Sequence, residues 1–287
     1  NNGQPNDLND SSIVATAPTT WIRMGDGDTF PTLKDTNGSA DLTMTNMTSG
    51  NIVNDVPTAP SFTNTKSVRF DGVDDYVDLG SGSTVADGGQ FTLSFWINGS
   101  AASSGGHTYL FSADYYNLHT TWNVRNNDII WRNINNGVGI LSTGVLDNSW
   151  HHILIVFNPT GADQTIRCFT DGANEVNVST DFRYAASSTT YIGGLRYIGN
   201  RGGGSYNGLN GAIDEFAAWD SDESSNLSSI YNGGVPSNLN DLNNPPSTWL
   251  RMGDGDTFPT LTDNGSGGNN GTMTNMTSGN IITDVPT

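Results

Sequence analysis

The chain has 287 residues, a formal net charge of −18 and apolar side chains at only 34% of its positions. Lys34 and Lys66 are its only lysines, so the surface lacks the positive charge that binds nucleic acid or anionic membranes. Cys168 stands alone, which excludes a disulfide within the chain. No apolar run reaches the ~18 residues of a membrane-spanning helix. From the charge we expect no nucleic-acid partner, and from the lack of such a run we expect no membrane insertion.

One stretch of the sequence occurs twice. Residues 20–36 reappear at 248–264 and residues 43–58 at 272–287, with 28 of 33 positions identical. A repeat with a domain-length period indicates a tandem array of domains. The expected organisation is a linker or the tail of a preceding repeat at 1–19, a complete domain at 20–240, a Pro-rich linker at 241–247, and the start of the next repeat or a docking segment at 248–287.

Short apolar stretches separated by Gly, Asn and Asp predict many short strands. Residues 91–97 alternate, with Phe91, Leu93, Phe95 and Ile97 on one face. Residues 150–157 are apolar on both faces over their second half, which is typical of a central strand. Further strands are expected at 68–70, 76–79, 165–170, 191–194 and 212–219.

One helix is expected near the end of this series. Asp220 or Ser221 can cap it, Leu227 and Ile230 share a face, and Gly233 can end it. Many short strands with a single short helix predict an all-β fold, in which two sheets form a sandwich.

Six motifs, in chain order, resemble those of laminin G-like domains, which have the concanavalin A-like jelly roll. They lie at 68–77, 91–97, 150–152, 169–172, 211–216 and 228–234. The resemblance implies an antiparallel β-sandwich with one short C-terminal helix. The repeated stretch is also similar to modules of marine bacteriophage structural proteins. Jelly-roll domains serve as sugar binders, adhesion modules and virion parts, so the fold alone gives no function.

The resemblance also implies a structural calcium ion near the rim of the sandwich. Asp214 and the turn at Asp71 would supply ligands, and Asp74 and Asp75 are further candidates. Calcium takes six to eight oxygen ligands, and a buried carboxylate such as that of Asp214 needs a partner. The alternative is that Asp214 pairs with an arginine or with backbone N–H groups.

Sequence signatures of catalysis are absent. The chain contains no G-x-S-x-G, H-E-x-x-H or P-loop motif. A glycosidase needs two carboxylates that flank a cleft, whereas the neighbours Asp214 and Glu215 should face opposite sides of a strand. For the same reason the adjacent His151 and His152 should not chelate one metal. We therefore expect no catalytic residues and no enzymatic activity.

Sugar binding is the more plausible chemistry, because flat rings and polar forks commonly hold sugars. Two segments combine such side chains. The candidate ligand-binding residues are Tyr115, Tyr116, Trp122, Arg125, Trp131 and Arg132 in the first segment and Arg196 and Tyr197 in the second. Alternatively, the tryptophans belong to the core and the arginines pair with nearby aspartates.

These features predict a non-catalytic structural or adhesion module of an extracellular or virion fibre. The fibre would be built from repeated jelly-roll domains, and its partners would be copies of itself, adjacent repeats and a surface glycan. The alternative is a carbohydrate-binding accessory module of a polysaccharide-degrading enzyme. A third hypothesis concerns residues 249–287, which could add strands to a neighbouring subunit or pack back on their own domain.

Overall fold

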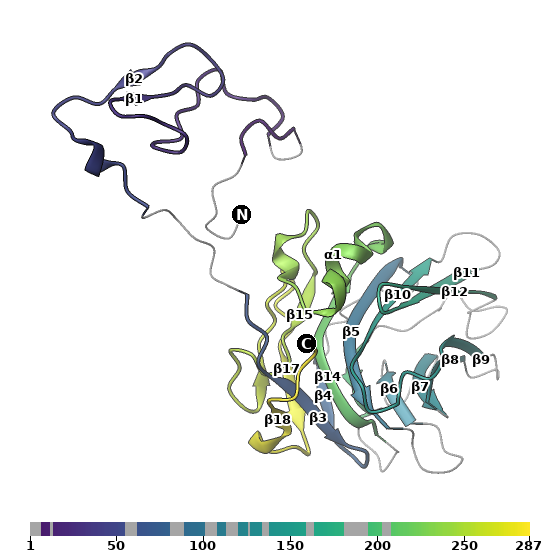
Figure 1. The fold of residues 1–287 in the computed structure, drawn as a ribbon. Helices are drawn as coiled ribbons and strands as arrows, with labels where there is room; N and C mark the ends of the chain where they lie inside the picture. The colour runs from purple at the N-terminus through teal and green to yellow at the C-terminus, as the bar shows by residue number, and fades with distance from the viewer. Residues whose placement is uncertain are drawn as a thin grey trace. The chain divides into compact units, whose positions relative to one another are not determined.

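The computed structural model divides the chain into two compact units, Asn1–Ser61 and Phe62–Thr287 (Figure 1). The structure describes residues 7–11, 14–54, 62–80, 89–100, 108–112, 120–125, 127–133, 138–158, 164–180, 195–202 and 208–287. Within the described strands, only the backbone is given for residues 120–125, 131–133, 138–139, 164 and 178–180.

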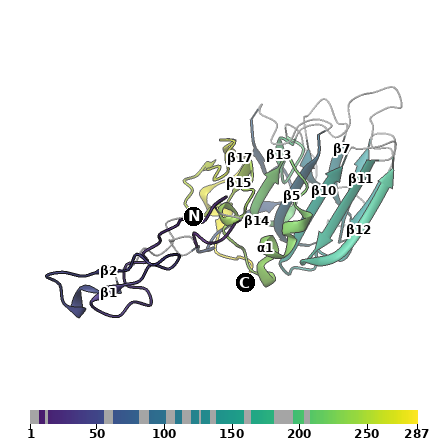
Figure 2. The same ribbon diagram turned by 90° about the horizontal axis from the view of Figure 1, so that it is seen from above.

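The second unit is a sandwich of two eight-stranded sheets (Figure 2). The first sheet has the order β12 (Ala173–Thr180), β11 (Gln164–Thr170), β10 (His151–Asn158), β5 (Phe91–Gly99), β14 (Asn210–Trp219), β3 (Ser67–Asp71) and β18 (Ile281–Ile282), and β15 (Thr248–Leu250) also pairs with β14. The second has the order β16 (Thr260–Leu261), β17 (Gly271–Thr274), β4 (Tyr76–Asp78), β13 (Tyr197–Ile198), β6 (Thr108–Ser112), β7 (Thr120–Arg125), β8 (Asp128–Asn133) and β9 (Val138–Ser142). The pairs between these strands are antiparallel, which confirms the predicted fold class.

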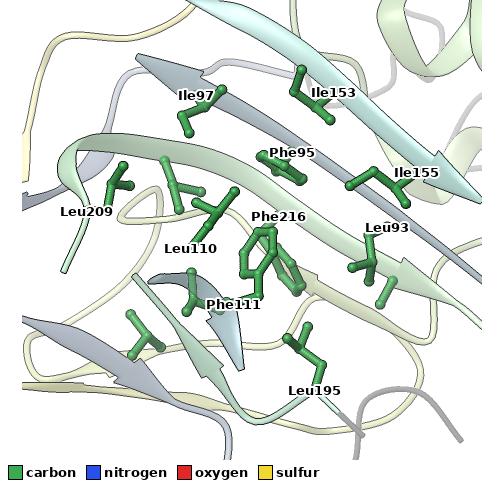
Figure 3. Packing of buried hydrophobic residues seen from close by; sticks show 14 of the residues in the cluster. Leu93, Phe95, Ile97, Leu110, Phe111, Ile153, Ile155, Leu195, Leu209 and Phe216 are labelled. Atoms are coloured by element: carbon green, nitrogen blue, oxygen red, sulfur yellow. The ribbon is translucent and has the colours of Figure 1, made fainter. Parts of the chain in front are cut away.

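The main core lies between the two sheets. The alternation predicted for 91–97 brings the apolar side chains of β5 to the inner face, where they meet those of β6 and β14 (Figure 3). The rings of Phe95 and Phe111 meet edge to face with centroids 4.9 Å apart, and Phe216 lies 5.6 Å from Phe111. Aromatic pairs at such distances stabilise a core beyond their buried area. The single thiol, Cys168, is buried in this cluster.

A second apolar cluster covers the outer face of the first sheet. Leu154 and Val156 of β10 belong to it, which explains why this central strand is apolar on both faces. The helix α1 (Leu227–Tyr231) contributes Ile230, and Trp249 comes from the repeated stretch. The sheet is therefore buried on both sides along β10.

The helix begins later than the sequence suggests. Regular structure starts with η2 (Ser224–Asn226) and continues as α1, whereas capping at Asp220 or Ser221 was expected. The reason is that Ser221 donates its hydroxyl hydrogen to Glu223 at 2.6 Å, so it bonds a side chain instead of capping the helix. Asn232, with a φ of 49°, ends α1 directly before Gly233.

The second copy of the repeated stretch belongs to the jelly roll. We call residues 248–287 the closing segment: its strands β15, β17 and β18 pair with β14, β4 and β3 and appear in yellow beside them in Figure 1. The segment also contains η5 (Ser278–Asn280), and η4 (Leu239–Asp241) precedes it. The compact unit thus runs past the boundary expected at residue 240, because the apolar residues of 248–287 pack into the core of their own chain.

The first copy of the repeated stretch lies in the other unit. Its strands β1 (Thr32–Leu33) and β2 (Leu42–Thr43) form a two-stranded antiparallel sheet, followed by η1 (Ser49–Asn51). The expected domain at 20–240 therefore differs from the compact units, since residues 20–54 do not share the core of 62–287. In the described part of the chain, no helix is long and apolar enough to cross a membrane.

Candidate functional site

Three carboxylates converge at the turn between β3 and β4. One oxygen from each of Asp71, Asp74 and Asp75 lies within 4.8 Å of the others. Asp71 and Val73 define the turn, since the Val73 N–H donates to the Asp71 carboxylate at 2.8 Å. Asp75 is buried and accepts the Asp71 N–H at 3.0 Å. All three belong to the metal ligands expected from the sequence, and we call them the acidic turn.

Asparagine side chains from two distant segments hold the acidic turn in place. Asn280 of the closing segment donates to Asp75 at 3.0 Å, and Asn275 donates to the carbonyl of Asp74 at 3.1 Å. From the other side, Asn200 donates to the Val73 carbonyl at 3.2 Å. Sequence reasoning missed these three asparagines, although the repetition of Asn275 and Asn280 in both copies was an available signal.

The donor chemistry of the acidic turn fits a hard divalent cation. All three groups offer oxygen, which is what calcium prefers, and solvent or nearby carbonyls would complete its six to eight ligands. Burial raises the pKa of Asp75, and the neighbouring charges of Asp71 and Asp74 raise it further. A bound cation would relieve that repulsion.

The structure does not bring Asp214 into the acidic turn. The Asp214 carboxylate is fully buried and accepts hydrogen bonds from Asn64 at 2.7 Å and from the Glu215 backbone N–H at 2.8 Å. Burial, and then the charge of Glu215, raise the pKa of Asp214 well above its usual range. This arrangement matches the alternative of pairing with a backbone N–H group.

Glu215 connects the closing segment to the centre of the first sheet. It lies in a β-bulge between Asp214 and Ala217 with a φ of 47°, and its side chain is buried. Its carboxylate accepts the Trp249 indole N–H at 2.6 Å and the Arg251 Nε–H at 3.3 Å. Burial raises the pKa of Glu215 to about 7, against the lowering effect of Arg251. Both neighbouring carboxylates are therefore engaged in structural contacts.

The two adjacent histidines take separate structural roles. His152 is buried, its Nε2 lies 2.9 Å from the Ser94 hydroxyl, and burial lowers its pKa to about 3. His151 lies 2.8 Å from the Asp171 carboxylate through Nδ1 and 3.3 Å from Asp147 through Nε2. No group of three potential metal ligands includes either histidine among the residues that the structure describes.

The predicted ligand-binding residues fall into two places on the second sheet. In β7 and β8, Trp122 lies directly opposite Trp131 in backbone register, and Arg125 and Arg132 belong to the same two strands. Residues opposite one another in an antiparallel pair share a face of the sheet. Tyr115 and Tyr116 lie outside the described residues. The register brings the two tryptophans of the prediction together. Because Trp122 also lies opposite Phe111 of the main core, their face of the sheet is the inner one.

Arg196 and Tyr197 lie at β13, near the middle of the same sheet. Arg196 binds the Asp78 carboxylate through two nitrogens, at 2.9 and 3.1 Å, and lies over the Tyr197 ring at 4.8 Å. Burial alone would raise the pKa of Asp78, but the bonds from Arg196 hold this pKa below its usual range. Tyr197 is almost fully buried, and the Tyr76 ring meets it edge to face at 5.5 Å. This pairing with an aspartate is the structural alternative that the sequence left open.

Comparison with known proteins identifies the fold. A sequence model of the concanavalin A-like lectin/glucanases superfamily matches residues 71–225, more than half of the chain. This match confirms the laminin G-like resemblance seen in the six motifs. No curated protein sequence matches the chain.

One solved structure shares the fold at low sequence identity, and others are similar over part of the chain. A protein from Bacteroides ovatus, assigned as carbohydrate-binding, superposes with a TM-score of 0.56 and 14% identity over 89% of this chain and 68% of its own. A heptameric SAP-like pentraxin from Limulus polyphemus gives 0.44 and 15%, over 58% and 82% of the two chains. The LG4–5 domains of the mouse laminin α1 chain give 0.37 and 14%, over 58% and 44%. At such identities the likeness concerns the fold alone.

Proposed function

Because the chain belongs to the concanavalin A-like lectin/glucanases superfamily, we propose that its jelly-roll unit is a non-catalytic carbohydrate-binding module. The superfamily includes binding proteins and glucanases, so the choice between them depends on the residues of this chain. The observation that carries the proposal is the register of β7 and β8, which places Arg125 and Arg132 on the opposite face of the sheet from Phe111 of the main core. Two guanidinium groups on the outer face of a sheet suit the hydroxyl groups of sugar rings.

The position of the buried carboxylates supports a non-catalytic role. A glycosidase needs a carboxylic acid and a carboxylate on either side of the scissile bond. Asp214 and Glu215 are instead buried, and their oxygens accept hydrogen bonds from Asn64, Trp249 and Arg251. Neither carboxylate is therefore open to a sugar. The module would display a glycan-binding face at an extracellular or virion surface, as part of a fibre of repeated units.

A glycan array with the full chain, followed by titration calorimetry on the best ligand, tests the proposal. We expect Arg125→Ala and Arg132→Ala each to weaken binding about tenfold, because each removes one set of guanidinium donors. Arg23→Ala is the matched control, since Arg23 is an exposed arginine in the other unit. Absence of binding to any glycan, or equal affinity in all three variants, would overturn the proposal.

We also propose that the acidic turn holds a structural calcium ion. The convergence of Asp71, Asp74 and Asp75 supports it, together with the oxygen-only donor set. Millimolar calcium should raise the melting temperature of the full chain after chelator treatment, because a ligand that binds only the folded state stabilises it. Asp75→Asn should abolish the shift, whereas Asp26→Asn, on an exposed turn of the other unit, should keep it. An unchanged melting temperature in the wild-type chain would refute the calcium site.

A further inference from the structure

The two copies of the repeated stretch have the same local conformation. The backbone N–H of Trp21 donates to the Asp35 carboxylate at 2.9 Å. The corresponding bond of the closing segment, from Trp249 to Asp263, measures 2.7 Å. The turn that follows the tryptophan and the capping box of the short helix are also repeated. The first copy therefore holds the shape of a closing segment while it lies in a unit whose described strands form only a two-stranded sheet.

The two copies differ sharply in what covers their apolar side chains. Met252 of the closing segment is fully buried in the main core, whereas its counterpart Met24 is 73% exposed. Met276 is 9% exposed, and its counterpart Met47 is 51% exposed. Exposed apolar side chains that cluster on one segment mark an interaction surface. At these two positions the first copy presents to solvent methionines that the closing segment buries, whereas Leu33, the counterpart of Leu261, is buried in both copies.

The polar groups that anchor the closing segment also have counterparts in the first copy. Glu215 accepts hydrogen bonds from the Trp249 indole and from Arg251. The first copy keeps both donors, as Trp21 and Arg23. Arg23 instead makes an exposed ion pair of 2.7 Å with Asp26 of its own turn, and such surface pairs contribute little stability. If Arg23 exchanged Asp26 for the Glu215 of another chain, the loss of the surface ion pair would therefore cost little stability.

The asparagines that hold the acidic turn are repeated as well. Asn46 and Asn51 of the first copy correspond to Asn275 and Asn280. The positive φ that orients Asn275, 62°, recurs as 58° at Asn46. A first copy placed in the position of the closing segment would thus offer the same two amides to an acidic turn.

Substitutions between the aligned residues keep the buried face aliphatic. They are Ile22 for Leu250, Lys34 for Thr262, Thr36 for Asn264, Val53 for Ile282 and Asn54 for Thr283. Two of the five exchange one aliphatic side chain for another. The other three replace residues that are exposed in the closing segment, namely Thr262, Asn264 and Thr283.

One neighbouring position decides which copy fits better. Gly271 pairs with Leu261 in the closing segment, and Leu42 pairs with Leu33 in the first copy. A Cβ atom added to Gly271 would lie 2.6 Å from Cγ1 of Val77, which is closer than atoms of this kind approach. A leucine there would have to displace Val77, and overpacking of this kind destabilises a core. The closing segment is therefore preferred over the first copy in the position beside β14, β3 and β4.

We propose that residues 20–58 are a second closing segment. They dock beside β14, β3 and β4 of a second copy of this chain, in the place that the closing segment of that copy has left. The partner is a jelly-roll unit of this sequence, because 28 of 33 aligned positions of its natural occupant are identical to those of the first copy. Docking adds strands to both sheets of the partner. It links one chain to the next without a new type of interface.

Disulfide trapping between two full-length chains tests the proposal. The acceptor carries Ala218→Cys together with Ile22→Asp and Leu250→Asp, which disable both of its own copies. The donor carries Thr20→Cys, the counterpart of position 248, which pairs with Ala218 in β15. Paired strand residues lie about 4.5–5.5 Å apart between Cα atoms, within the span of a disulfide. A single chain with Ala218→Cys and Thr248→Cys serves as the geometric control.

The proposal predicts a disulfide between positions 218 and 20 of different chains, identified by peptide mass spectrometry. Adding Ile22→Asp to the donor should lower the yield at least tenfold. Adding Leu42→Gly instead should give the same yield at a roughly tenfold lower donor concentration, because the clash with Val77 is removed. Cys168 is buried and should stay reduced. Cross-linking that is absent, or insensitive to both donor substitutions, would overturn the proposal.

The acceptor gives a decisive result even if it is unfolded alone. In that case, addition of the donor should restore its β-sheet circular dichroism signal, since the missing strands are supplied by residues 20–58. An acceptor that stays unfolded with excess donor would contradict the proposal as directly as a missing cross-link.

Discussion

The matched methionines Met252 and Met24 offer a direct comparison of the two repeated stretches. Met252 is fully buried and Met24 is 73% exposed, while both have nearly the same backbone conformation, with φ values of 50° and 54°. Replacing a buried methionine by alanine costs about 2–5 kcal/mol, through lost burial and the cavity left behind. A surface substitution usually changes stability by about 0.5 kcal/mol or less. We therefore expect Met252→Ala to destabilise the jelly-roll unit strongly and Met24→Ala to leave it unchanged.

Urea denaturation followed by tryptophan fluorescence and circular dichroism measures both effects. For a unit of the size of Phe62–Thr287, the loss at Met252 corresponds to a fall in melting temperature of roughly 4–20 °C. Because the backbone is the same at both positions, intrinsic alanine effects cancel in the comparison. Equal destabilisation by the two substitutions, or a change at Met252 of about 0.5 kcal/mol or less, would refute the assignment of the closing segment to the core.

Three further predictions concern buried titratable groups. Burial raises the pKa of Glu215 from 4.5 to about 7, so the folded state keeps a proton that the unfolded state releases. The stability that this group contributes therefore falls as pH rises from about 4.5 to 7. Glu215→Gln should gain stability relative to the wild type over this range. Urea midpoints of the two proteins that change with pH in parallel would contradict this. His152, whose pKa is lowered to about 3, should give the nitrogen NMR shifts of a neutral imidazole at pH 5, and an imidazolium signal would exclude its burial. Burial raises the pKa of Cys168 to about 12, so a thiol reagent should label it only after unfolding, and prompt labelling of the native chain would show the thiol to be accessible.

The strands and their sandwich could be predicted because their signals are local. Alternation over 91–97 specifies one buried face, and the apolar run of 150–157 specifies a central strand, and both are confirmed by β5 and β10. The acidic turn was predictable for the same reason, since Asp71, Asp74 and Asp75 are close in sequence.

The position of the closing segment could not be predicted, because the two copies are nearly identical in sequence. What separates them is the close approach of Gly271 to Val77, which lie far apart in sequence and meet only in the folded unit. The environment of Asp214 and Glu215 was unpredictable in a similar way. Strand alternation places neighbours on opposite faces, but the β-bulge at Glu215 leaves both carboxylates buried.

Hydrogen–deuterium exchange on the full chain at low concentration tests the central claim most directly, namely that residues 248–287 and not 20–58 complete the jelly roll. Peptides that cover β15 and β17 should exchange as slowly as those from β14, because their amides are bonded within the sheets of the sandwich. Peptides that cover 20–24 and β2 should exchange much faster. Equal exchange in the two copies, or slower exchange in the first, would contradict the account.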